Sequence, residues 1–91
     1  MKETHRDAVA SEVARILREE RVARDLSMTT VGERAGLAHQ MISFVEREMR
    51  SPSLDTMLRI SEALEIRLSD VLRKAETAVK KQKSLKPAKW R

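Results

Sequence analysis

The 91-residue chain contains no cysteine and no tyrosine, and it has only one phenylalanine, one tryptophan, two prolines and two glycines. Without cysteine the chain can form no disulfide, and it offers no thiolate for metal binding or nucleophilic catalysis. No apolar run approaches the length that a membrane span needs, and the charged N-terminal segment has no apolar stretch typical of a signal peptide. We therefore expect a cytoplasmic protein with no membrane partner.

Catalytic and metal-binding sequence patterns are also missing. The two histidines, His5 and His39, lie far apart in the chain, and no HExxH or Cys/His spacing occurs. Acidic pairs such as Glu19 and Glu20 fit a solvated helical face better than a catalytic pair. We expect no enzymatic activity, no metal and no small-molecule cofactor.

The net charge of +5 is distributed unevenly along a chain that is long enough for one small domain. Residues 73–91 contain eight basic residues and one acidic residue, whereas residues 1–72 contain eleven basic and thirteen acidic residues. Residues 80–91 include one proline and no periodicity, so we expect a mobile basic arm after a domain of residues 1–79. Such an arm binds nucleic-acid phosphates or an anionic membrane surface, or it only keeps the protein soluble.

Apolar residues recur with helical spacing along the chain, and no strand-like alternation competes with them. Residues 28–35 and 39–47 predict two short helices, with longer helices before and after them. The residues placed to cap the first, second, fourth and fifth helices are Thr4, Ser27, Ser53 and Ser69. The expected inward-facing residues are, helix by helix, Val9, Val13, Ile16 and Leu17; Val31 and Ala35; Ile42, Val45 and Met49; Leu54, Met57, Leu58, Ser61 and Leu64; and Val71, Leu72, Ala75 and Val79.

Both glycines of the chain lie within residues 28–47, where the two short helices meet. Helices that cross closely need a small residue at the crossing, and Gly32 supplies it. The turn four residues later needs a positive φ angle, which Gly36 tolerates. Two short helices joined by a tight glycine turn are typical of a helix-turn-helix motif.

Three stretches carry a more specific signal: ERAGL at residues 33–37, ISFVE at residues 42–46 and SPSLDTMLRISEAL at residues 51–64. On these motifs the chain resembles the Cro/λ-repressor-type helix-turn-helix family, the XRE family of prokaryotic and phage regulators, from about Val13 to Leu72. The resemblance implies an all-α, compact five-helix λ-repressor-like DNA-binding domain followed by the basic arm. It also implies a transcriptional regulator, expected to be a repressor, that binds a pseudo-palindromic operator as a homodimer.

In this family the third helix lies in the major groove and presents its first residues to base edges. The base contacts that the resemblance implies are His39, Gln40, Ser43 and Phe44. The DNA backbone or base contacts that it implies are Thr29, Arg47 and Arg50. An arginine late in the first helix often pairs with a glutamate in the third, and Arg21 and Glu46 match that structural ion pair.

The sequence departs from the family pattern at five positions, one of which is Phe44, where polar or basic residues are common. Met28 stands where glutamine usually opens the second helix, and Ala38 replaces the serine that usually caps the third. Glu48 and Glu65 stand where the family usually has glycine after a helix. Those two helix ends must adopt another geometry or accept about 1 kcal/mol of left-handed strain.

A protein that binds two half-sites is expected to be a dimer. The expected dimer surface is formed by the apolar residues after the fourth helix, which are Ile66, Leu68, Val71, Leu72 and Val79. The expected partners are double-stranded DNA and a second copy of the chain, and a further protein partner is left open. A second interpretation is a protein-interaction module of the same fold with weak or lost DNA binding. The acidic excess of residues 1–72 and the apolar Met28, Met41 and Phe44 favour it.

Overall fold

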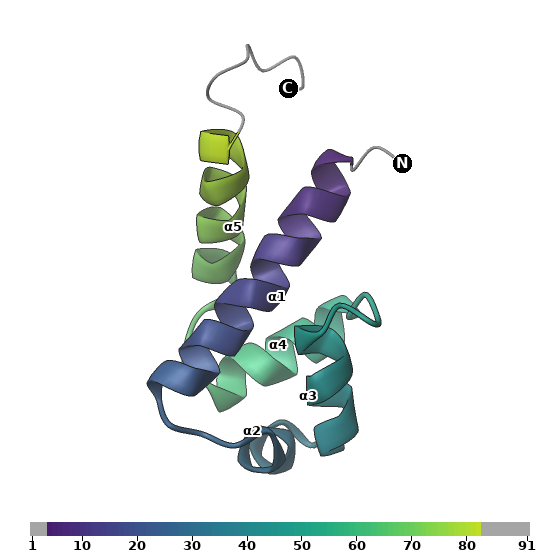
Figure 1. Ribbon diagram of the computed structural model, residues 1–91. Helices are drawn as coiled ribbons and strands as arrows, with labels where there is room; N and C mark the ends of the chain where they lie inside the picture. Colours follow the sequence, from purple (N-terminus) through teal and green to yellow (C-terminus); the bar gives the residue numbers. More distant parts are fainter. Residues whose placement is uncertain (1–3, 83–91) are drawn as a thin grey trace.

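The structure is a computed structural model, and it describes residues 4–82 of the chain. The helices are α1 (His5–Ala23), α2 (Met28–Ala35), α3 (His39–Glu46), α4 (Leu54–Ala63) and α5 (Leu68–Gln82), with no strand in the described residues (Figure 1). The all-helical, five-helix prediction is confirmed. Residues 80–82 of the predicted arm belong to α5, and the rest of that arm lies outside the described residues.

The helices are arranged in two groups along α1 (Figure 1). α5 packs beside α1, whereas α2, α3 and α4 gather near the C-terminal half of α1. Within the second group α2 contacts both α3 and α4. The short α3 is therefore held from behind by α1 and α2, and its opposite face is left open.

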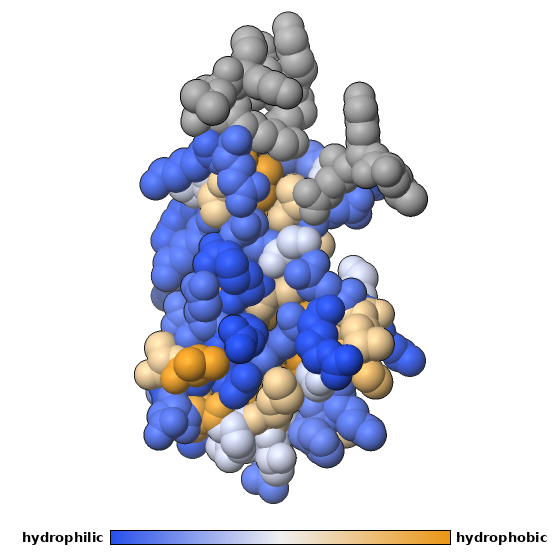
Figure 2. All heavy atoms as spheres, viewed as in Figure 1, coloured by the Kyte–Doolittle hydropathy of each residue, from blue (hydrophilic) through white to orange (hydrophobic). Residues whose placement is uncertain are grey.

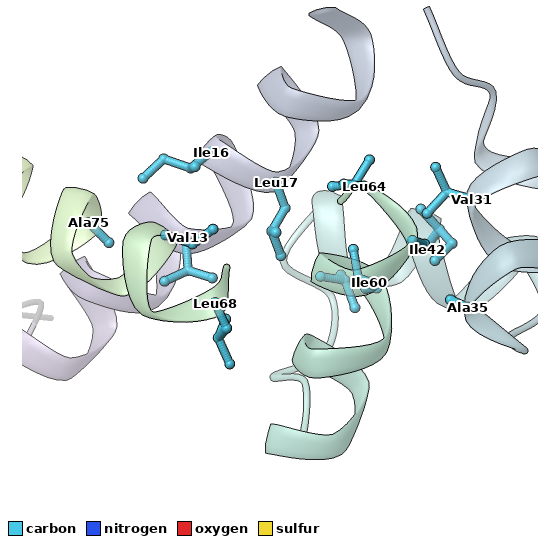
Figure 3. Close-up of a cluster of buried hydrophobic side chains, with 13 residues drawn as sticks. Val13, Ile16, Leu17, Val31, Ala35, Ile42, Ile60, Leu64, Leu68 and Ala75 are labelled. Carbon is cyan, nitrogen blue, oxygen red and sulfur yellow. The ribbon is translucent and has the colours of Figure 1, made fainter. Parts of the chain in front are cut away.

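One hydrophobic core joins both groups of helices (Figure 3). Leu17 of α1, Val31 of α2, Ile42 of α3 and Leu64 at the end of α4 are each at most 1% exposed. Burial of an aliphatic side chain of this size contributes about 1.5–3 kcal/mol relative to exposure. Because every helix donates buried residues to this core, the position of α3 depends on the packing of all the others.

Three of the predicted helix caps are confirmed. The Thr4 hydroxyl accepts a hydrogen bond from the Asp7 amide at 3.0 Å, and the Asp7 carboxylate accepts one from the Thr4 amide at 3.3 Å, which forms a capping box. Ser27 accepts from the amide of Thr30 at 3.0 Å, and Ser53 accepts in the same way from the amide three residues later. Each side chain satisfies an amide that the helix leaves without a backbone partner.

The predicted cap of the last helix is wrong. Helix α5 begins at Leu68, so Ser69 lies inside its first turn. The amides of Asp70 and Val71 already donate to the carbonyl oxygen of Arg67. The helix therefore starts two residues before the position that capping by Ser69 would require.

Helices α1 to α4 end in the same way, with a residue in the left-handed region after the last turn. These residues are Asp25, Gly36, Glu48 and Glu65, with φ angles of 57°, 72°, 60° and 60°. The amide of the following residue donates back to a carbonyl of the last helical turn, as in the Schellman motif. Glu48 and Glu65 therefore adopt the strained left-handed conformation, which was one of the two alternatives predicted for them. The same conformation at Asp25 was not predicted.

The predicted inner face of α4 is partly wrong. Ser61 and Leu64 are buried, but Leu54 is 62% exposed and Leu58 is 42% exposed. Ile60 and Ala63 are buried instead. The centre of the buried face is therefore rotated away from the two leucines, which lie on its solvent side.

Candidate nucleic-acid interface

The turn between α2 and α3 depends on both glycines. A Cβ atom on Gly32 would lie 2.6 Å from the carbonyl oxygen of Leu37 and 3.3 Å from the amide nitrogen of His39. No side chain fits there, because the backbone entering α3 crosses directly over α2. Gly36 has a φ angle of 72°, which glycine adopts without strain. An Arg59 guanidinium nitrogen donates to the Ala35 carbonyl at 3.2 Å and so connects α4 to the end of α2.

Arg21 and Glu46 connect α1 to the end of α3. Arg21 Nε donates to Glu46 Oε2 at 2.7 Å, and Arg21 Nη2 donates to Glu46 Oε1 at 3.0 Å. A third bond runs from Arg21 Nη1 to the Leu26 carbonyl at 2.8 Å. The side chains are only 13% and 4% exposed, and hydrogen bonding to Glu46 raises the pKa of Arg21 against the opposing effect of burial. This bidentate pair fixes the orientation of α3 on the scaffold.

Helix α3 has one buried face and one open face. Ile42 and Val45 are 1% and 2% exposed and point into the core. The predicted base-contact residues lie away from that face: His39 and Gln40 are exposed, whereas Ser43 and Phe44 are half-buried. Ala38 stands at the N-cap and makes no side-chain hydrogen bond, as its type requires. The open face thus brings together the four residues that the family resemblance assigned to the bases.

The family membership rests on a comparison as well as on this geometry. A helix-turn-helix family model matches residues 17–71, which is more than half of the chain. The chain belongs to the Cro/C1-type helix-turn-helix family, the XRE family. Comparisons with curated proteins and with solved structures give no match.

This XRE-family chain keeps the arginines next to α3 out of ion pairs. Among the described residues, neither Arg47 nor Arg50 is paired with a carboxylate. Arg47 instead donates to Ser43 Oγ at 3.3 Å, and the Arg50 guanidinium carbon lies 5.5 Å from the centre of the Phe44 ring. Carboxylates pair with five other arginines, Arg15, Arg21, Arg24, Arg59 and Arg73, whereas Arg6, Arg18, Arg34 and Arg67 have no such pair in the described residues either.

The contact between Phe44 and Arg50 had no signal in the sequence. The two residues are six positions apart, which is not a helical neighbour spacing. They meet because the chain leaves α3 after Glu46 and reverses at Glu48. The same reversal explains why Met49 is 58% exposed, although it was predicted to face inward with Ile42.

The remaining residues near α2 and α3 make the open face more polar than the sequence suggested. Met28 and Met41 are half-buried and pack against the core. Thr29 is exposed beside the Ser27 cap of α2. In the view of Figure 2, hydrophilic residues cover most of the surface and apolar ones form small separate groups.

Three residues of the predicted dimer surface are not accessible. Leu68, Val71 and Val79 are 8%, 2% and 0% exposed, and α5 packs along α1. Periodicity places them on one face of α5, but that face is covered by the chain itself. Ile66 and Leu72 are half-buried and remain partly accessible.

The described part of the molecule contains an open groove of about 720 Å³, which the sequence did not reveal. It lies between the first half of α1, the segment joining α3 to α4, and α5. Val9, Met57 and Leu72 contribute apolar surface, and Glu48 and Arg50 contribute charge. The groove is separate from the open face of α3 except at Arg50, which lines the one and contacts Phe44 on the other.

Two negative findings concern residues 4–82 only. No group of three or more histidine or acidic side chains gathers in a way that would hold a metal ion. No helix in this range combines the length and the apolar character needed to cross a membrane.

Proposed function

We propose that this DNA-binding regulator of the XRE type is a transcriptional repressor that binds a pseudo-palindromic operator as a homodimer. Helix α3 would lie in the major groove of each half-site. The observation that carries the proposal is the open face of α3, which holds His39, Gln40, Ser43 and Phe44 while the opposite face is locked in the core. Such a regulator works in the cytoplasm, on the DNA of the nucleoid.

Each residue of the open face has a chemical role in this proposal. The Gln40 amide bonds adenine N6 and N7, and the Phe44 ring packs against a thymine methyl group. His39 donates a hydrogen bond to guanine N7, and the Ser43 hydroxyl forms a hydrogen bond with either adenine or guanine. Together these groups would distinguish base pairs in the major groove, where the donor and acceptor pattern of each pair is unique.

The phosphate contacts would come from Thr29, Arg47 and Arg50. Contacts to phosphates set the register of a protein on the duplex but carry no sequence information by themselves. Arg47 and Arg50 suit this role because no carboxylate among the described residues neutralises them.

Homodimerisation is part of the proposal because one short helix reads only one half-site. Family members pair two half-sites about one helical turn, roughly 34 Å, apart. Accessible apolar side chains that could form a contact between copies include the half-buried Ile66 and Leu72 and the exposed Leu54 and Leu58. Sedimentation at tens of micromolar with operator DNA tests this part, and a strictly monomeric protein on one half-site would refute it.

Selection of bound sequences from random DNA tests the central proposal. We expect an inverted repeat to be enriched with the wild-type chain. Gln40→Ala should remove about 1–3 kcal/mol of discrimination at one base pair per half-site. Its melting temperature should stay unchanged, because Gln40 is exposed and makes no core contact. Failure to enrich any sequence would refute the operator-binding role.

A second candidate function is a protein-interaction module that has kept the fold. The open groove between α1, the segment joining α3 to α4, and α5 favours it, as does the acidic excess of residues 1–72. The salt dependence of duplex binding separates the two functions, because phosphate contacts dominate non-specific affinity for DNA. A folded protein with no duplex affinity at low salt would support the interaction module.

A further inference from the structure

Phe44 is the only phenylalanine of the chain, and it lies half-buried on the open face of α3. The Arg50 guanidinium carbon is 5.5 Å from the centre of its ring. That distance is within the range in which a guanidinium is attracted to the face of an aromatic ring. The two side chains therefore form a pair at the edge of the candidate DNA-binding surface.

Arg50 has no other partner that would fix its guanidinium among the described residues. It belongs to the irregular segment between α3 and α4, so no helix restrains its backbone. No carboxylate in residues 4–82 pairs with it, and the nearby Glu48 accepts a hydrogen bond from Ser11 Oγ at 2.6 Å instead. An exposed arginine in such a segment would otherwise sample many side-chain conformations.

We propose that Phe44 is a positioning residue that holds the Arg50 guanidinium ready for a DNA phosphate. This inference rests on the proposed function and gives the ring a role beyond contact with a thymine methyl group. The attraction to the ring needs no hydrogen bond, and no N–H group of Arg50 donates to an acceptor in the described residues, so these groups remain available for phosphate oxygens. The charge also stays unneutralised until DNA binds.

The proposal predicts that Phe44 affects the phosphate contact made by Arg50. Removal of one phosphate contact lowers the slope of log affinity against log salt by about 0.9. Arg50→Ala should show that decrease. Phe44→Leu keeps an apolar side chain for a thymine methyl but removes the aromatic face, so it should lower affinity and slope in the same direction. Phe44→Trp retains an aromatic face and should restore both.

The experiment uses the full chain and a fluorescein-labelled mixed-sequence duplex of about 30 base pairs, titrated between about 50 and 200 mM salt. A mixed-sequence duplex suffices because a phosphate contact does not depend on the bases. Arg67→Ala is the matched control, since Arg67 is exposed and lies among Glu20, Asp70 and Lys74, away from α2 and α3. It should leave the slope unchanged, and thermal melting of every variant checks that each is folded.

The supporting result is a non-additive cycle: Phe44→Leu weakens binding in the wild-type background and has no further effect beside Arg50→Ala. Equal slopes for Phe44→Leu and wild type, with Arg50→Ala still reducing the slope, would overturn the positioning role and leave the proposed function intact. Fully additive effects would overturn it as well. A wild-type chain without affinity for the duplex at low salt would overturn both this inference and the proposed function.

Discussion

Removal of the Glu46 carboxylate should destabilise the protein more than removal of any exposed carboxylate. In Glu46→Ala the Arg21 guanidinium loses two hydrogen bonds and keeps only the one to the Leu26 carbonyl. Breaking a fully buried pair costs about 3–5 kcal/mol. Because the Arg21 side chain is 13% exposed and can partly reach water, we expect about 2–4 kcal/mol.

Thermal unfolding followed by circular dichroism measures this destabilisation. For a domain of this size 1 kcal/mol corresponds to about 4–8 °C, so the melting temperature should fall by about 8–32 °C. Glu48→Ala is the control, since Glu48 is exposed and makes a single hydrogen bond to Ser11. Its destabilisation should stay at about 1 kcal/mol. The raised pKa of Arg21 makes its contribution complete at any pH below the ordinary arginine pKa, so the difference should not change between about pH 5 and 9.

A double-mutant cycle with Arg21→Ala isolates the pair itself. If the ion pair is the cause, the double variant should be much more stable than the sum of the two single effects predicts. Equal destabilisation by Glu46→Ala and Glu48→Ala would refute the reasoning. Strict additivity in the cycle would refute it too, because each residue would then act without the other.

Glu65→Gly should stabilise the protein by about 0.5–1 kcal/mol, because it relieves the backbone strain of an exposed residue with a φ angle of 60°. As the control, Glu62→Gly inside α4 should destabilise the protein by about 1 kcal/mol. Urea unfolding of both variants checks this, and destabilisation by both would contradict the strain argument. Gly32→Ala should cost about 1–3 kcal/mol in the same assay, because its Cβ would lie 2.6 Å from the Leu37 carbonyl oxygen, and a neutral result would show that the turn can shift. Truncation after Gln82 keeps α5 intact and removes four basic residues. If these residues bind phosphates, the slope of log affinity for a duplex against log salt should fall by about 0.9 for each phosphate that is no longer bound. An unchanged slope would exclude that role.

Local signals in the sequence predicted local structure well. Thr4, Ser27 and Ser53 cap helices because a hydroxyl and an amide three residues later are enough to form the bond. Gly32 and Gly36 were predicted from the same kind of local demand. The Arg21–Glu46 pair is different, since its residues are distant in sequence and only the family resemblance brought them together.

The errors about the dimer surface and the inner face of α4 share one physical cause, which is that periodicity describes a face but not what covers it. Val79 lies on an apolar face of α5, as predicted, but α1 covers that face within the same chain. Leu54 and Leu58 belong to a broad apolar face of α4. The other helices cover only the part of that face that carries Ile60 and Ala63. The Phe44–Arg50 contact required the path of the segment after α3, which no residue pattern encodes.

The distribution of ion pairs makes the proposed DNA-binding surface of α3 compatible with the acidic excess of residues 1–72. The paired carboxylates of the scaffold belong to Glu12, Glu19, Glu20, Glu46, Asp55 and Asp70. The charges of a carboxylate and a guanidinium in an ion pair largely cancel. The electrostatic potential of the pair is therefore small beyond the screening length, which is about 8–10 Å at physiological salt. Arg47 and Arg50 have no such partner among residues 4–82, and the carboxylate of Glu48 between them accepts a hydrogen bond from Ser11, so both guanidinium groups at the end of α3 keep their charge although the sum over residues 1–72 is negative. The potential that a phosphate meets is set by those unpaired groups within a screening length, and net charge is therefore a poor guide to whether this domain binds DNA.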